Sequence, residues 1–163
     1  MSASFVEEAK ELAEKVYGNS IDECGYPVLR RLQWDAEQFS DDDCRCAAYL
    51  QGIFHKTGKR MMQYMAEGYA FPMRSGYAAE LLYYDDSMSL SEYLDRALTH
   101  DYASAVLLAD LQYRMNLANY TDQGADSFRK SRMYHNAYIY TLQQIEVKYP
   151  QVLSFFKTVP VIS

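Results

Sequence analysis

The sequence predicts an all-α fold, a compact bundle of about seven to eight helices. Apolar residues recur through most of the chain at the spacing of a buried helix face. The alternating pattern of a β-strand is almost absent, and only residues 158–162 resemble one weakly. Helix-breaking and capping residues separate the apolar segments at short intervals, which is typical of helices joined by short connections.

The first half of the chain predicts three helices before its midpoint. Apolar spacing indicates a helix over residues 4–17, which Gly18 ends, and a second over 27–39. A third is expected over 40–58 without interruption. Asp41–Asp43 resemble a calcium loop, but the glycine and the later glutamate of such a loop are missing. We therefore expect these aspartates to lie in the first turn of a helix, where their negative charge is stabilised by the positive end of the helix dipole.

Glycine, proline and helix-capping residues define the helices that follow. A short helix is expected over 59–67, before Gly68, and another over 72–84, where proline suits the first turn. The segment SLSE is a capping box and predicts a helix over 89–98. Asp101 is expected to cap a helix over 101–119.

A long helix is predicted over 126–148, with Phe128, Tyr138, Leu142 and Ile145 facing the core. Pro150 lies just beyond its end. Residues 1–150 therefore form one helical domain, and residues 151–163 form a C-terminal tail.

Composition excludes several classes of partner. The net charge of -6 disfavours binding to a nucleic-acid backbone, which needs a clustered positive field. No apolar run is long enough to span a membrane, and the N-terminus lacks the pattern of a secretory signal. Cys24, Cys44 and Cys46 are too few for a disulfide framework, and no second pair completes a zinc site. We expect reduced cysteines and a cytoplasmic protein.

Three segments together resemble a known family. They are GYPVLRRLQWDA (25–36), AAYLQGIFHKT (47–57) and SLSEYLDRALTHDYASAVLLADLQYRMNLANY (89–120). Their order resembles the HD-domain metal phosphohydrolases, and most closely the small helical hydrolases related to alarmone (guanosine tetraphosphate) pyrophosphohydrolases. The resemblance covers roughly residues 4–148 and implies the HD-domain-like helical bundle.

The resemblance also implies a metal site that this chain has lost. The family holds one divalent ion, usually manganese, with a histidine, a His-Asp pair and a final aspartate. Here these positions are occupied by Arg31, by Gln51-Gly52 and by Asp110, so one ligand remains. The family's assisting Glu-Asp pair is replaced by His55-Lys56, and Arg114 stands near the end of the last motif. We expect no catalytic residues, no metal ligands and no cofactor.

The dipeptide His100-Asp101 invites a second metal assignment. It precedes a predicted helix, where aspartate commonly serves as the N-cap, and no second histidine stands at suitable spacing on a preceding helix. We interpret Asp101 as a helix cap.

Two hypotheses concern the lost metal site. Arg31 and Asp110 form an ion pair there, since a buried carboxylate needs a cation; alternatively, Arg31 points to solvent and Asp110 makes a local backbone contact. The candidate pocket comprises Arg31, Gln51, His55, Lys56, Asp110 and Arg114. It could hold an anion such as a nucleotide phosphate; alternatively, the lysines near residue 58 only form an exposed cationic helix end.

Three functions remain open at this point. The first is a degenerate, metal-free phosphohydrolase-like protein that binds a ligand or regulates a partner. The second is a phosphohydrolase that is still active through Asp110, with His55 or His100 recruited. The third is a helical interaction module, for which the sixteen tyrosines of the chain suit a homodimer interface.

Overall fold

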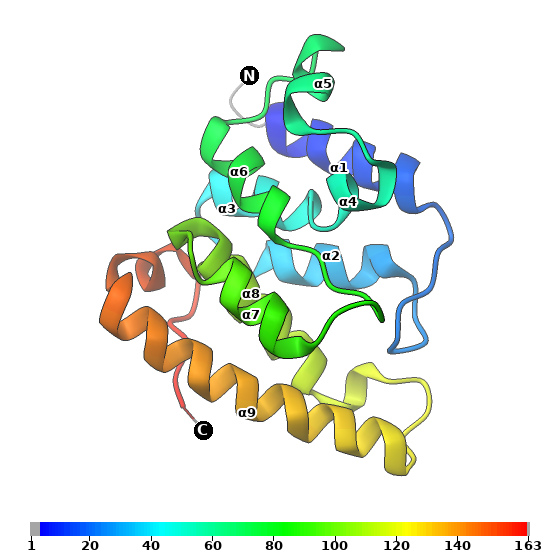
Figure 1. Ribbon diagram of the computed structural model, residues 1–163, viewed down its shortest axis with the longest axis vertical. Helices are drawn as coiled ribbons and strands as arrows, with labels where there is room; N and C mark the ends of the chain where they lie inside the picture. The colour runs from blue at the N-terminus through cyan, green and yellow to red at the C-terminus, as the bar shows by residue number, and fades with distance from the viewer. Residues whose placement is uncertain (1–3, 163) are drawn as a thin grey trace.

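The computed structural model describes residues 4–162, and it is helical, as predicted (Figure 1). Nine α-helices and two short 3-10 helices, η1 and η2, occur in this range. Their bounds are α1 Ser4–Tyr17, α2 Val28–Glu37, α3 Asp42–Tyr49, α4 Ile53–Thr57, α5 Met61–Ala66, α6 Met73–Leu81, α7 Leu90–Ala97, α8 Asp101–Met115, η1 Leu117–Asn119, α9 Ala125–Lys148 and η2 Pro150–Phe155.

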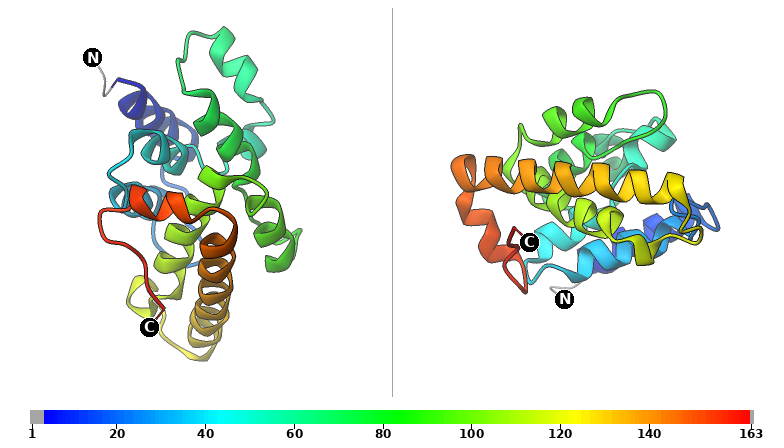
Figure 2. Two further views of the ribbon diagram at one scale, coloured as in Figure 1. Left: turned by 90° about the vertical axis from the view of Figure 1, so that its left-hand side faces the viewer. Right: turned by 90° about the horizontal axis from the view of Figure 1, so that it is seen from below.

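Helix α8 is the centre of the bundle. It packs against α9 on one side and against α2, α3 and α6 on the other (Figure 2). The segment from Tyr102 to Leu111 is buried throughout, because neighbours surround this helix on all sides. The site described below includes two charged residues of this helix, Asp110 and Arg114, both buried.

Helix α9 covers the outside of α8 and buries one stripe of its own surface. Tyr138, Leu142 and Ile145 lie in the core, as predicted. Phe128 was expected there too, but 52% of it is exposed. The first turns of α9 contact η1 and lie beyond the main core, so periodicity alone placed this residue incorrectly.

The predicted helix over residues 40–58 is in fact two helices, α3 and α4. Gly52 separates them with a φ of 74°, in the left-handed region that favours glycine. Its N–H donates to the carbonyl of Leu82, 2.7 Å away, instead of continuing the helix. The Tyr17 hydroxyl donates to the carbonyl of Gln51, at 2.6 Å. The break turns Gln51 into the interior.

The other predicted boundaries differ by smaller amounts. The helix expected over 72–84 ends at Leu81, and the one expected over 101–119 ends at Met115, followed by η1. The segment expected as a tail includes η2, and Phe156 packs against Phe39 with ring centroids 4.5 Å apart.

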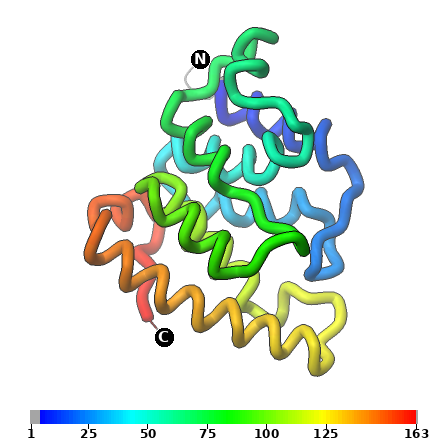
Figure 3. Tube along the Cα trace, viewed as in Figure 1, coloured from blue at the N-terminus to red at the C-terminus, as the bar shows by residue number. Residues whose placement is uncertain are grey.

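Two connections converge on one side of the bundle. Figure 3 shows the connection between α1 and α2 (residues 18–27) approaching the connection between α6 and α7 (residues 82–89). Both border the cleft described below. Elsewhere, Cys24, Cys44 and Cys46 are free and buried. In the described part of the chain, no helix combines the length and apolarity that crossing a bilayer requires.

We predict that Gly52→Ala lowers the free energy of unfolding more than Gly58→Ala does. Both glycines have φ 74°, so both substitutions introduce backbone strain of about 1 kcal/mol. A Cβ at Gly52 would lie 2.4 Å from the Tyr17 hydroxyl, whereas a Cβ at Gly58 meets nothing within 4 Å. Urea unfolding of the two variants measures the difference, and equal losses would contradict the role of the Tyr17 contact.

Candidate functional site

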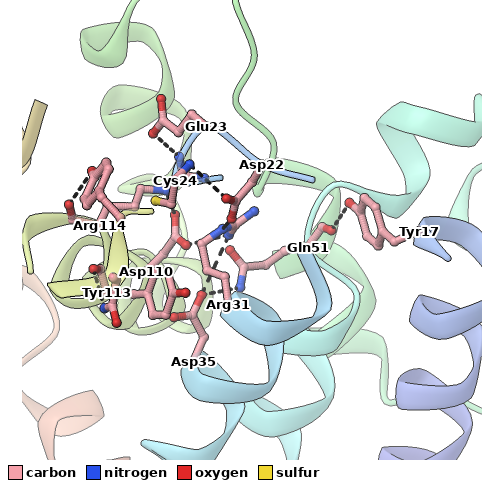
Figure 4. A network of polar contacts seen from close by, with 12 residues as sticks. Tyr17, Asp22, Glu23, Cys24, Arg31, Asp35, Gln51, Asp110, Tyr113 and Arg114 are labelled. Atoms are coloured by element: carbon pink, nitrogen blue, oxygen red, sulfur yellow. Dashed lines mark hydrogen bonds and ion pairs between the residues drawn. The ribbon is translucent and has the colours of Figure 1, made fainter. Parts of the chain in front are cut away.

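Asp110 lies at the centre of a buried polar network (Figure 4). Its Oδ1 accepts a hydrogen bond from Arg31 Nη1, at 2.6 Å. Its Oδ2 accepts from Arg114 Nε, at 2.8 Å, and from the Tyr93 hydroxyl, at 3.1 Å. The predicted pairing of Arg31 with Asp110 is therefore confirmed, and the alternative of a solvent-directed arginine is wrong.

Local helix geometry and tertiary packing both contribute to this network. Arg114 follows Asp110 by four residues on α8, so the two side chains share one helix face. Arg31 comes from α2 and Tyr93 from α7, and the packing of these helices on α8 brings them to the same carboxylate. The site joins three helices through one charged group.

Two carboxylates of the connection between α1 and α2 complete the ion pairs. Asp22 Oδ2 accepts from Arg31 Nε, at 3.2 Å, and Glu23 Oε1 accepts from Arg114 Nη1, at 2.7 Å. The Tyr134 hydroxyl also donates to Glu23. Each guanidinium is thus bound by two carboxylates.

The charges determine the protonation of Asp110. Burial by itself would raise the pKa of this carboxyl, but the positive charges of Arg114 and Arg31 outweigh burial and hold its pKa well below the usual range. Asp110 is therefore an ionised carboxylate between two guanidiniums. Removing Arg31 or Arg114 would leave this buried carboxylate with one guanidinium instead of two.

Asp35 is a second fully buried carboxyl beside this network. It follows Arg31 by four residues on α2, but the nearest guanidinium nitrogen is 3.9 Å from its Oδ2. Gln51 Nε2 donates to that Oδ2, at 3.0 Å, while Oδ1 has no hydrogen-bond partner among the described residues. Burial, and then the negative charge of Asp110, raises the pKa of Asp35 well above its usual range. Both effects favour the protonated form of Asp35.

A cleft of about 650 Å³ opens above the network. Arg31, Gln51 and Arg114 contribute to its floor, together with Tyr93. Most of the remaining lining comes from the two converging connections, with single residues from α1, from the start of α2 and from the turn between α3 and α4. These residues are Tyr17, Ile21, Asp22, Glu23, Val28, Gly52, Leu82, Tyr83, Tyr84, Asp85, Asp86 and Met88.

His55 and Lys56 lie apart from the buried network. Both are exposed on α4 and border a second, smaller opening that shares residues with the cleft. The His55 ring stacks on Tyr83, with centroids 4.1 Å apart, and its Nε2 lies 2.9 Å from Asp85 Oδ2. The structure thus brings four of the six predicted pocket residues together and leaves His55 and Lys56 at the edge.

The cap before α8 differs from the prediction by one residue. His100 is the N-cap, and its Nδ1 accepts from the N–H of Ala103, at 3.2 Å. Asp101 is instead the first helical residue, where its carboxylate lies near the positive end of the helix. The capping role expected for Asp101 belongs to His100, since the preceding backbone is extended there.

The residues present do not fit the metal that the HD-domain resemblance implies. The guanidinium of Arg31 has no lone pair to offer a metal ion, Gly52 has no side chain, and both oxygens of Asp110 face guanidinium groups. Within residues 4–162, no group of three or more His, Cys, Asp or Glu side chains is arranged to hold a metal ion.

Sequence reasoning missed several members of the network. Asp35 could have been found, because it shares a helix face with Arg31 at a spacing of four residues. Asp22 and Glu23 lie in a connection without periodicity, and Tyr93 comes from α7, a separate helix. No local pattern marks these residues as partners of the arginines.

Comparison with known proteins adds no assignment: no family model and no curated protein matches the chain.

We predict that Asp110→Ala destabilises the fold by about 3–5 kcal/mol, because it leaves two buried guanidiniums facing each other. The matched control is Asp126→Ala, which removes an aspartate that pairs with Arg129 on the exposed face of α9 and should change little. Chemical unfolding compares the two variants. A loss in Asp110→Ala as small as in the control would contradict the central role of the buried pair.

We predict that Asp35→Asn becomes progressively more stable than the unmutated protein as pH rises above about 4, the ordinary pKa of an aspartate. Asp35 has a raised pKa in the folded state, so folding binds its proton, and this stabilisation is lost as pH rises from about 4 toward the folded pKa. The gain has a limit of about 1.4 kcal/mol per pH unit, the value for one proton. The pKa of Asp110 is lowered in the folded state, so this group changes the pH dependence of stability only at lower pH.

Unfolding free energies of the two proteins at several pH values provide the measurement. Parallel stability curves across this range would show that Asp35 is ionised in the folded protein.

Proposed function

We propose that this protein is a catalytically degenerate relative of the HD-domain phosphohydrolases that acts by binding rather than by hydrolysis. One observation carries the proposal: both oxygens of Asp110, the single retained ligand position, are occupied by guanidinium groups. Permanent side-chain charge thereby supplies the neutralisation that a metal ion supplies in the proposed relatives.

The competing proposal of a surviving phosphohydrolase has less support. It would recruit His55 or His100 beside Asp110 as an acid or a base. His55 is exposed and engaged with Tyr83 and Asp85, and His100 caps α8. Neither histidine contributes to the cleft above Asp110.

The charge of the cleft bears on the ligand. A nucleotide or another anion would need free positive charge at the floor. Arg31 is bound by Asp110 and Asp22, and Arg114 is bound by Asp110 and Glu23. Internal carboxylates therefore neutralise the charge of both guanidiniums, which favours a binding protein whose ligand is not an anion.

We predict that the purified protein hydrolyses guanosine tetraphosphate no faster than a protein-free control, with manganese present in excess. The reason is that Asp110 offers no free oxygen to a metal ion and no histidine lies beside it. Phosphate and pyrophosphate release measures activity, and elemental analysis measures bound metal, expected well below one atom per chain. A manganese-dependent rate that Asp110→Asn abolishes would overturn the proposal.

A further inference from the structure

The floor of the cleft contains a hydrogen-bond acceptor, on a buried side chain, that no described residue uses. Gln51 is only 4% exposed, and its Nε2 donates to Asp35 Oδ2, at 3.0 Å, and to the carbonyl of Ala48, at 3.1 Å. These two hydrogen bonds use both amide protons, so the amide orientation is fixed. Gln51 Oε1 then accepts no hydrogen bond from the described residues, although the side chain lines the cleft. An acceptor in this position suits a ligand that donates an N–H.

The charges around the cleft favour a positive ligand. The lining includes two guanidiniums, and each of them is already bound by two carboxylates within the protein. Two further carboxylates lie at the edge, Asp85 and Asp86, and both are exposed. His55 and Ser87 contact Asp85, while Asp86 forms no ion pair among the described residues. The cleft therefore has an excess of negative charge.

Apolar side chains contribute to the walls between the floor and the edge. Leu82, Met88 and Val28 line them, together with the ring of Tyr84. An alkyl stem can pack along such walls while its charged ends remain at polar groups. Both ends of the cleft, the Gln51 carbonyl and the exposed aspartates, accept hydrogen bonds.

We propose that the cleft binds an organic cation, an ammonium or guanidinium group on a short alkyl stem. The inference rests on the proposed function, since a metal at Asp110 would change the charge of the floor. One charged group of the ligand donates to Gln51 Oε1, and the stem contacts the apolar walls. Asp86, and beside it Asp85, attracts a second positive group at the edge.

Calorimetric titration with agmatine, which has a guanidinium and an ammonium at the ends of a butyl stem, tests the proposal. We expect binding of one agmatine per chain that weakens as salt is added, because exposed carboxylates attract the ligand. Guanosine tetraphosphate should produce no heat under the same conditions. No heat with agmatine at millimolar concentration, or tighter binding of the nucleotide, would overturn the inference.

Matched variants locate the site. Asp86→Asn should weaken agmatine binding about threefold, while Asp95→Asn, an exposed aspartate of α7 outside the cleft, should leave it unchanged. Gln51→Leu should weaken binding about tenfold or more, since it removes the buried acceptor. If Gln51→Leu does not fold, the comparison of Asp86→Asn with Asp95→Asn decides the matter. Equal affinities of those two variants would contradict binding in this cleft.

A free amine and an arginine side chain of a peptide offer the same chemistry. A titration with an arginine peptide blocked at both ends distinguishes them: binding as tight as that of agmatine indicates a peptide source, and binding of agmatine alone indicates a free amine. Either result supports a cation site, whereas binding of neither overturns it. Hydrolysis is measured separately, so a failed titration without hydrolysis refutes this inference and leaves the proposed function intact.

Discussion

The charge of Asp110 is the constraint on which the rest of the site depends. A carboxylate with no exposed surface must be paired, because an isolated charge in the core costs several kcal/mol. Arg31 and Arg114 provide that pairing, and each then requires a further carboxylate, which Asp22 and Glu23 supply from the connection between α1 and α2. One buried charge therefore fixes the position of that connection on α2 and α8.

The same network determines the character of the cleft. Its guanidiniums contribute little net charge to the floor, since they are neutralised from within. Burial and the adjacent negative charge of Asp110 raise the pKa of Asp35, which favours its protonated form. The amide nitrogen of Gln51 donates to Asp35 and to the carbonyl of Ala48, so the side-chain oxygen is the atom of this amide that remains available to a ligand. The result is a cleft whose lining combines hydrogen-bond acceptors with more carboxylates than guanidiniums.

Much of the fold could be predicted from the sequence. The apolar spacing located the helices, since a buried stripe repeats with the helical period. The break at Gly52 was missed, because α3 and α4 continue one apolar pattern, and only the contacts with Leu82 and Tyr17 reveal the turn. Phe128 also fits the helical period, but the core does not extend to the first turns of α9. A helical pattern shows which face is apolar, and tertiary packing decides how far the core extends along it.

The residues of the site also divide into those that the sequence predicted and those that only the tertiary structure revealed. By itself the sequence determined an all-helical chain, with Asp110 and Arg31 at two positions where the HD-domain resemblance implies metal ligands. The need to neutralise a buried carboxylate predicted their pairing. Spacing on a single helix also brings Arg114 to Asp110. Tertiary structure alone decided that Asp22, Glu23 and Tyr93 join them and that His55 and Lys56 do not. Local spacing follows from the helical period, whereas contacts between residues far apart in the chain, such as the 79 positions between Arg31 and Asp110, depend on how the helices pack.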